Sequence, residues 1–257
     1  MVYQGSKARL LKDILPFIQN CIDGNNIKTY CEPFVGGANV IASVKAENRQ
    51  GCDNNPALIT LLRYMQNFPE MKDFPETCPV EHYKEVRSDY RQNGNNFPEF
   101  YKAGIGYFAS YGGRFFDGGY GRDKTGKRDI YADRLANARK QAPLLSGISF
   151  NTMSYEDISI FNEVPEMFYC DPPYKGTKVY NGKNNFDYWC FYDWLRQLSQ
   201  KHFVLISEFQ MPDDFVCIWS KERLVGQKSD RTKGDRVCEK LFTLKGGLYD
   251  SWYKENK

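Results

Sequence analysis

The stretch MFYCDPPYKG, residues 167–176, ends an apolar run with an acid, two prolines and a tyrosine. Consecutive prolines fix φ and donate no backbone hydrogen bond, so a strand must stop there. Asp171 and Tyr174 would then project from a stiff ledge. A carboxylate and a proline-region carbonyl can accept hydrogen bonds from both hydrogens of an exocyclic amine. The tyrosine ring can stack on the planar base that carries this amine, and such stacking contributes about 1–3 kcal/mol. The motif therefore favours a site for an amino-substituted base, with an ordinary turn as the alternative.

A second polar cluster follows the first strand expected in the chain. Residues 28–34 predict a strand that ends at Pro33 and leads into Gly36 and Gly37, and Asp53 ends the next strand. Glycines let a ligand approach the backbone, and an acid on the neighbouring strand accepts hydrogen bonds from ribose hydroxyls. Two glycines alone would indicate only a loop. Because the sequence lacks G-x-G-x-x-G and G-x-x-x-x-G-K-[ST], a nucleoside cofactor without phosphates is favoured.

The elements that position these clusters alternate along the chain. Hydrophobic spacing predicts helices over 6–22, 36–47, 55–67 and 192–200, and strands over 28–34, 49–53, 147–153, 166–171, 202–209, 215–222 and 239–244. Pro16 predicts a kink or break in the first helix. The alternation predicts an α/β fold with a mostly parallel sheet and a terminal antiparallel strand.

Residues 68–145 interrupt this pattern with helical fragments and Gly-rich loops. We therefore expect one domain made of residues 1–67 and 146–257, with a mostly helical inserted domain at 68–145.

The predicted insertion contains a basic loop rich in glycine and aromatic residues. Residues 114–140 carry eight basic side chains against four acidic ones, a balance of +4, while the whole chain carries +3. This composition suits contact with phosphates and insertion beside an unstacked base, although a solvated surface is the alternative. The candidate DNA contacts are Arg114, Tyr120, Arg122, Lys124, Lys127 and Arg128. A second basic stretch holds Lys228, Arg231, Lys233 and Arg236.

Cysteine and histidine usage argues against metal or disulfide chemistry. The eight cysteines form no C-x-x-C pair, and the chain has two histidines, so we expect reduced thiols and no metal site. No apolar run approaches the roughly 20 residues that cross a bilayer. These features predict a cytoplasmic protein without a membrane partner.

Taken in order, the motifs resemble those of the Dam-type, D12-class (alpha group) S-adenosylmethionine-dependent DNA adenine N6-methyltransferases, particularly phage and prophage forms. The motifs that carry the resemblance are YQGSK at 3–7, EPFVGG at 32–37, DNN at 53–55 and DPPY at 171–174. They occur in the family's order, and the target-recognition insertion lies between the last two. The resemblance covers most of the chain.

The resemblance implies a Rossmann-like class I methyltransferase sheet, a target-recognition role for residues 68–145 and no metal. It also implies S-adenosylmethionine as methyl donor, S-adenosylhomocysteine as product, and double-stranded DNA as substrate in a bacterial or phage-infected cell. A monomer or weak dimer is expected. The implied cofactor-binding residues are Tyr3, Lys7, Glu32, Pro33, Phe34, Gly36, Gly37, Asp53, Asn54, Ser154, Tyr155 and Asp171. The implied catalytic residues are Asp171, Pro172, Pro173 and Tyr174.

One pair departs from the family's pattern. Ser154 and Tyr155 stand where relatives often have an Asp-Phe pair that recognises the cofactor's adenine. The tyrosine can stack, but the acid is missing, so either Asp157 replaces it or adenine recognition is weaker.

The implied mechanism requires an adenine flipped out of the duplex, at a cost of a few kcal/mol. Tyr174 would stack on it, while Asp171 and the Pro172 carbonyl would accept hydrogen bonds from N6 and direct its lone pair at the methyl group. Three alternatives stay open: N4-cytosine methylation, methylation of RNA, and a catalytically weak DNA-binding relative. Action within a restriction-modification pair or alone is also open.

Overall fold

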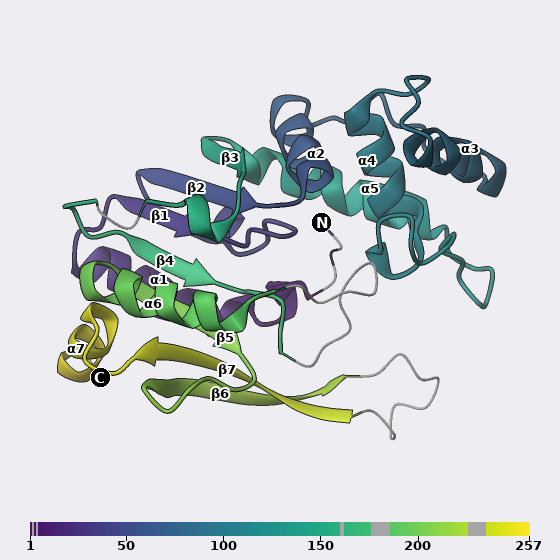
Figure 1. Cartoon of the computed structure of the whole chain (residues 1–257). Coiled ribbons are helices and arrows are strands. Elements are labelled where there is room, and N and C mark those ends of the chain that lie inside the picture. The colour runs from purple at the N-terminus through teal and green to yellow at the C-terminus, as the bar shows by residue number, and fades with distance from the viewer. Residues whose placement is uncertain (2, 4, 160–161, 176–185, 226–234) are drawn as a thin grey trace.

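A seven-stranded sheet forms the centre of the computed structural model, which describes residues 1, 3, 5–159, 162–175, 186–225 and 235–257 (Figure 1). The strands in this part of the chain are β1 (Thr29–Glu32), β2 (Asn48–Asp53), β3 (Ile148–Thr152), β4 (Met167–Cys170), β5 (Phe203–Glu208), β6 (Phe215–Val225) and β7 (Asp235–Leu244). The strand order is β3-β2-β1-β4-β5-β7-β6. Strands β3, β2, β1, β4 and β5 pair in parallel, and β7 pairs antiparallel with β5 and β6. The predicted sheet is confirmed.

The strand order reverses between β1 and β4, which lie side by side at the middle of the sheet. Chain order proceeds from β1 outward through β2 and β3 on one side, and through β4 and β5 on the other. In open α/β sheets, ligands bind at such a switch point, outside the carboxyl ends of the strands. Glu32 and Asp53 end β1 and β2, and Asp171 directly follows β4. The three carboxylates therefore meet at this edge.

Helices cover the sheet, and their ends follow ordinary capping chemistry. They are α1 (Leu11–Gly24), α2 (Pro56–Asn67), α6 (Tyr188–Lys201) and α7 (Leu248–Glu255). The Asn55 side chain accepts from the Leu58 amide at 3.3 Å, with Pro56 in the first helical position. Helix α2 packs on β2 and β3, and α6 packs on β5 and β7. Pro16 lies within α1, and the break falls earlier, at Leu10, after a 3-10 helix over Lys7–Arg9.

The helix expected over residues 36–47 is wrong. Gly36 and Ala38 have φ values of 48° and 54°, which a right-handed helix does not allow, and only a 3-10 turn, η2 (Ile41–Ser43), forms. Val40 and Val44 are buried in the core without helical packing. The loop after β1 therefore stays irregular and keeps its backbone beside the sheet edge.

Residues 68–145 contain α3 (Val80–Arg91), α4 (Glu99–Ala109) and α5 (Ile130–Gln141), in agreement with the mostly helical prediction. Figure 1 shows them together beyond α2, at one end of the sheet. Helix α4 packs against α2, α3 and α5. One cluster of buried side chains runs from the sheet into these helices, including Met65, Phe74, Phe108 and Tyr131. Their standing as a separate domain stays a prediction.

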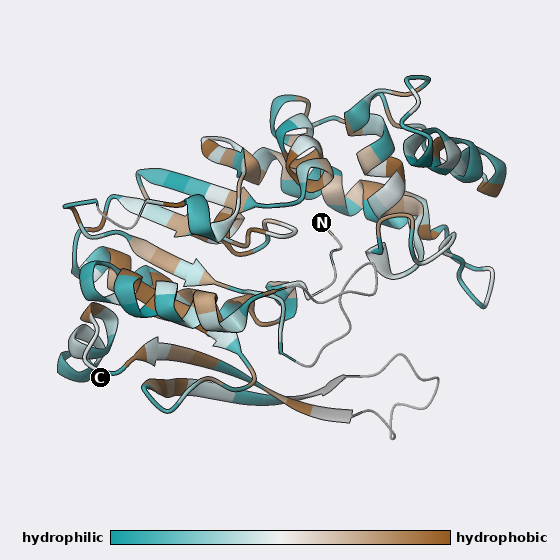
Figure 2. Ribbon diagram, viewed as in Figure 1, coloured by the Kyte–Doolittle hydropathy of each residue, from teal (hydrophilic) through white to brown (hydrophobic). Residues whose placement is uncertain are grey.

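Apolar residues follow the inner elements in Figure 2. All four residues of β4 are buried, whereas most of α3 is hydrophilic. Among the described residues, none of the helices is long and apolar enough to cross a membrane.

Candidate active site

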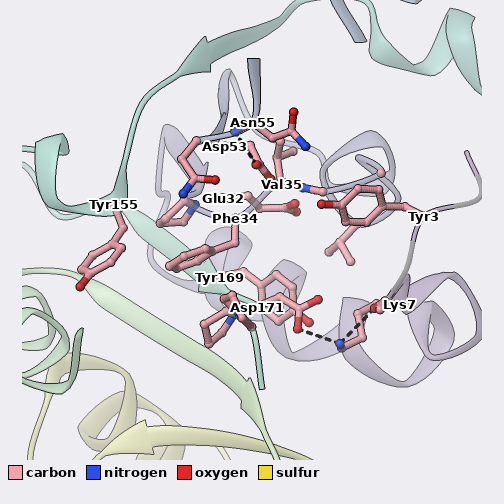
Figure 3. Close-up of a pocket in the computed structure, with 18 of the residues that line it drawn as sticks. Tyr3, Lys7, Glu32, Phe34, Val35, Asp53, Asn55, Tyr155, Tyr169 and Asp171 are labelled. Atoms are coloured by element: carbon pink, nitrogen blue, oxygen red, sulfur yellow. Dashed lines mark hydrogen bonds and ion pairs between the residues drawn. The ribbon is translucent and has the colours of Figure 1, made fainter. Parts of the chain in front are cut away.

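A cavity of about 760 Å³ opens at the carboxyl edge of β1, β2 and β4 (Figure 3). The residues that the sequence predicted for cofactor binding and catalysis all line it: Tyr3, Lys7, Glu32, Pro33, Phe34, Gly36, Gly37, Asp53, Asn54, Ser154, Tyr155, Asp171, Pro172, Pro173 and Tyr174. Its volume lies within the range typical of cofactor pockets, roughly 300–1,000 Å³. Segments far apart in the sequence thus share one cavity, although their roles remain predictions.

Asp53 connects the end of β2 to the loop after β1. Its two carboxylate oxygens accept hydrogen bonds from the Gly36 amide at 3.2 Å and the Asn55 amide at 3.0 Å. Burial raises the pKa of Asp53 to about 6, against the opposing effect of these two amides. The carboxylate is therefore held in place by backbone donors at the cavity wall.

Glu32, at the end of β1, is a deeply buried acid, with 3% of its surface exposed. The Tyr30 hydroxyl donates to its Oε1 at 2.6 Å. Burial raises the pKa of Glu32 to about 8, and the nearby Asp171 carboxylate adds to the rise. Burial therefore favours the protonated form of Glu32 near neutral pH.

Gly37 is required by the close approach of the N-terminal segment. A Cβ at Gly37 would lie 2.8 Å from Asn39 Nδ2 and 2.9 Å from Tyr3 Cβ, both closer than ordinary contact. Figure 3 shows Tyr3 across the cavity from Phe34 and Tyr155. The glycine thus lets the segment that carries Tyr3 and Lys7 close over the loop.

Three aromatic rings form one wall of the cavity. Phe34, Tyr155 and Phe186 have mutual ring-centroid distances of 5.6 to 5.9 Å. Such a group can hold a flat apolar ring by stacking or edge contact. Its composition suits the purine of a nucleoside.

Asp157 does not line this cavity, so the suggestion that it replaces the missing acid is not supported. Its carboxylate accepts from the Ser154 amide at 3.1 Å in the capping box of the short 3-10 helix η5 (Tyr155–Asp157). Glu156, the neighbouring acid, does line the cavity. An acceptor for the cofactor's adenine is therefore available one position earlier.

Asp171 and Lys7 form an ion pair at the end of β4. Lys7 Nζ lies 2.7 Å from Asp171 Oδ1, and the two side chains are 4% and 20% exposed. The same Nζ lies 4.5 Å from the centroid of the Tyr174 ring. Burial raises the pKa of Asp171, and the Lys7 ammonium opposes this rise. Lys7 therefore contacts both the acid and the ring that the sequence assigned to the target base.

Three residues around the DPPY motif were not predicted from the sequence. The Tyr174 hydroxyl donates to Oε2 of Glu239 on β7 at 2.9 Å. The Phe209 ring meets Tyr174 edge-on, at 4.5 Å between centroids. The Tyr188 hydroxyl donates to the Pro173 carbonyl at 3.0 Å. The sequence did contain one signal for Glu239. This acid alternates with Leu241 and Thr243 along β7, so it lies on the face of the strand whose other side chains are buried.

The DNA-contact candidates lie apart from the cavity. Arg114, Arg122, Lys124, Lys127 and Arg128 are exposed, and Arg128 pairs with Asp133 at 2.6 Å.

Several side chains of the basic stretch pack inside the protein instead. The Tyr120 hydroxyl donates to the Cys78 carbonyl at 2.6 Å, and Phe116 is 2% exposed. Arg134 donates to backbone carbonyls of Phe108 and Ser110 at the end of α4. The loop is therefore partly built into the core, and fewer of its rings can reach DNA than its composition indicates.

Residues Lys228, Arg231 and Lys233 of the second basic stretch lie outside the described residues, as does the side chain of Arg236. Within the described residues, no three or more His, Cys, Asp and Glu side chains gather as metal ligands do.

Comparison with known proteins identifies a family. The family described as D12 class N6 adenine-specific DNA methyltransferase matches residues 3–201. The chain is 27% identical over 206 residues to modification methylase StsI of Streptococcus sanguinis, which covers 73% of this chain and 30% of that one. It is 25% identical over 280 aligned positions to Type II methyltransferase M.MjaIII of Methanocaldococcus jannaschii, covering 94% of this chain and 96% of that one. The chain thus spans less than a third of the first relative and nearly all of the second.

Proposed function

The chain belongs to the D12 class of N6 adenine-specific DNA methyltransferases, and from this premise we propose how its own residues carry out that reaction. The methyl group passes from S-adenosylmethionine to N6 of an adenine flipped out of duplex DNA. One observation carries the proposal: the loop after β1, with Asp53, and the DPPY motif line the same cavity. A methyl donor and an amino acceptor bound there are close enough for direct transfer.

The cofactor side of the cavity comprises the loop after β1 and the aromatic wall. Asp53 accepts hydrogen bonds from ribose hydroxyls, since its carboxylate is already fixed by two amides. Phe34 and Tyr155 would hold the adenine ring, and the Glu32 carboxyl group would bind the positively charged methionine portion. When bound, S-adenosylmethionine supplies a methyl group activated by a positive sulfonium.

The base side comprises Asp171, the Pro172 carbonyl and Tyr174. The carboxylate and the carbonyl accept hydrogen bonds from the two N6 hydrogens, so that the amino lone pair leaves conjugation with the ring and can attack the methyl group. The Pro173 carbonyl already accepts from Tyr188, which leaves the Pro172 carbonyl for the base. Positioning of this kind accounts for much of the rate when two groups react directly.

Lys7 must leave Asp171 when the base enters. Its ammonium lies on the carboxylate and over the ring, the two groups that the adenine needs. Burial raises the pKa of Asp171, which suits this acid to take up the proton that N6 loses after methylation. We therefore assign Lys7 to the binding site of the target base as well as to that of the cofactor.

We assign DNA contact to the exposed basic side chains between α4 and α5. Arg114, Arg122, Lys124 and Lys127 are exposed, and residues 110–129 carry five basic side chains against three acidic ones. Their charge suits sequence-independent phosphate contact. Residues 68–145 would then deliver the duplex to the cavity, in the cytoplasm of a bacterial or phage-infected cell.

Product analysis tests this function directly. Duplex DNA is incubated with the protein and isotope-labelled S-adenosylmethionine, digested to nucleosides and analysed by mass spectrometry. We expect labelled N6-methyldeoxyadenosine, and far less of it with Asp171→Asn. Labelled N4-methyldeoxycytidine alone, label only in a parallel RNA sample, or DNA binding without any label would each overturn the proposal in favour of another activity.

A further inference from the structure

Glu239 is a buried acid that the mechanism above does not use. It lies on β7, is 2% exposed, and lines the cavity. Strand β7 pairs with β5 on one side and along β6 on the other, so its backbone is held from both sides. An acid at this position therefore has little freedom to move.

The contact of Glu239 with the DPPY motif is specific. Tyr174 is 8% exposed, and its hydroxyl donates to Glu239 Oε2 at 2.9 Å. The Phe209 ring packs against the Tyr174 ring edge-on, and Lys7 lies over one face of the Tyr174 ring. Fixing the hydroxyl determines how far the ring reaches into the cavity and how its plane is turned.

A neighbouring acid supports the same segment by another route. Glu208 at the end of β5 is 1% exposed, and its carboxylate accepts from the amide of Lys175 at 2.7 Å and from that of Phe209. Glu208 thus fixes the backbone after the motif, whereas Glu239 fixes the side-chain tip. Neither contact replaces the other.

Energetics argue that Glu239 is more than a packing residue. Burying a carboxylate costs several kcal/mol before its partners compensate, and apolar replacement of buried charged groups is often neutral or stabilising. A phenylalanine in place of Tyr174 and a leucine in place of Glu239 would fill the same space without that cost. A buried acid that lines the cavity and accepts a hydrogen bond from the DPPY motif therefore favours a functional role.

We propose that Glu239 is a positioning residue that holds the Tyr174 ring in the orientation needed to stack on the flipped adenine. The inference rests on the proposed function. It assigns the antiparallel hairpin of β6 and β7 a part in catalysis, separate from cofactor binding. Removing the acceptor should slow methyl transfer and leave S-adenosylmethionine affinity unchanged.

The test compares Glu239→Leu, Glu239→Gln, Tyr174→Phe and the Glu239→Leu/Tyr174→Phe double variant. A hydrogen bond to a charged group, converted to a rate, corresponds to roughly 10- to 100-fold, so we expect kcat of Glu239→Leu to fall by about that factor. Glu239→Gln, whose amide oxygen still accepts, should restore kcat to within about threefold of wild type. The double variant should be no slower than the slower single variant.

Two controls separate positioning from stability. Glu222→Gln changes an exposed acid on the other strand of the hairpin and should leave kcat unchanged. Melting temperatures and calorimetric affinity for S-adenosylmethionine are measured for every variant. With 2-aminopurine at the target position, Glu239→Leu should still flip the base but show higher fluorescence than wild type, because the base is less stacked.

Wild-type kcat in Glu239→Leu, losses that multiply in the double variant, or a failure of Glu239→Gln to restore activity would each overturn the positioning role while leaving the proposed function standing. A wild-type protein that methylates no DNA would instead overturn the proposed function, and with it this inference.

Discussion

At the scale of single residues, the carboxyl groups of the cavity differ in the side chains that they contact. Glu32 is bonded to Tyr30, and burial raises the pKa of Glu32 to about 8. Asp171 is held by Lys7, and burial raises its pKa against that ammonium. The first group is suited to respond to a bound cation, and the second to hold an amine.

The pKa of Glu32 predicts how cofactor affinity depends on pH. The protonated form predominates below pH 8, and a positively charged ligand favours the ionised form, so affinity should rise from pH 6 to about pH 9 and binding near neutral pH should release a proton. Calorimetry in buffers of different ionisation enthalpy measures both. In Glu32→Gln the rise above pH 7 should disappear, while a smaller rise near pH 6 from Asp53 stays. An affinity that is flat between pH 7 and 9 in wild type would contradict this.

The ion pair of Asp171 predicts the cost of removing this acid. Asp171→Asn should lower kcat by about 10²- to 10⁴-fold, because the acceptor of N6 loses its charge. It should also lower the melting temperature, since Lys7 is 4% exposed and would lose the carboxylate that faces it. Asp171 is therefore expected to stabilise the fold as well as to serve the reaction, because its partner Lys7 is buried.

The matched control is Lys7→Met/Asp171→Asn. This double variant should recover melting temperature but not methyl transfer, as followed by thermal denaturation and incorporation of labelled methyl groups. Activity regained in the double variant would show that the acid serves only to neutralise Lys7.

At the scale of elements, the sequence predicted the strands well and the loops less well. Runs such as 166–171 show their strand by apolar content and a proline stop, and the structure confirms it. The helix over 36–47 failed because two residues with positive φ cannot be recognised by hydrophobic spacing. Glu239, Phe209 and Tyr188 could not be placed at the site, because contacts between residues 15 to 65 positions apart leave no local pattern in the sequence.

The basic stretch also shows what amino-acid composition alone cannot predict. Counting charges identified residues 114–140, but Arg134, Phe116 and Tyr120 engage carbonyls or core rings. A charge count does not tell which side chains end on the surface. Exposed Lys124 and Lys127 are the better candidates.

These two lysines give a prediction for the loop between α4 and α5. Lys124→Ala and Lys127→Ala should each weaken DNA binding, and for each variant the loss should be about the same for every DNA sequence. Each substitution should also reduce the slope of log K against log[salt] by about 0.9. Fluorescence anisotropy over a salt series measures the slope. Lys28→Ala, at the amino end of β1 and paired with Glu47, is the matched control and should leave the slope unchanged. Equal slopes in all variants would remove the loop from the interface.

At the scale of the whole molecule, the sheet and the helices of residues 68–145 share side chains and hydrogen bonds. Gln141 on α5 donates to the carbonyl of Gly37 at 2.9 Å and to that of Ala38 at 3.1 Å. Asn55 donates to the Tyr107 hydroxyl on α4 at 2.9 Å. The loop after β1 is therefore supported by the two helices that flank the loop to which we assign DNA contact.

This continuity predicts a single unfolding transition. S-adenosylmethionine at a hundred times its Kd should stabilise the fold by about 2.7 kcal/mol, and so raise Tm by roughly 5–10 °C for a chain of this size. Hydrogen exchange should show slower opening in α4 and α5 as well as in the sheet. A second calorimetric transition that the cofactor leaves unmoved would instead indicate that residues 68–145 unfold alone.

The cavity wall is closed by residues from both ends of the described chain, with Lys7 near its beginning and Glu239 on β7. During synthesis the motifs at 32–37 and 171–174 emerge well before β7, so a nascent chain holds every recognisable motif and still lacks a wall. The Tyr174 hydroxyl then lacks the Glu239 carboxylate that it donates to in the folded protein. A chain that stops after residue 174 would thus carry all of the family's motifs and should still fail to methylate DNA, because it lacks β5, β6 and β7.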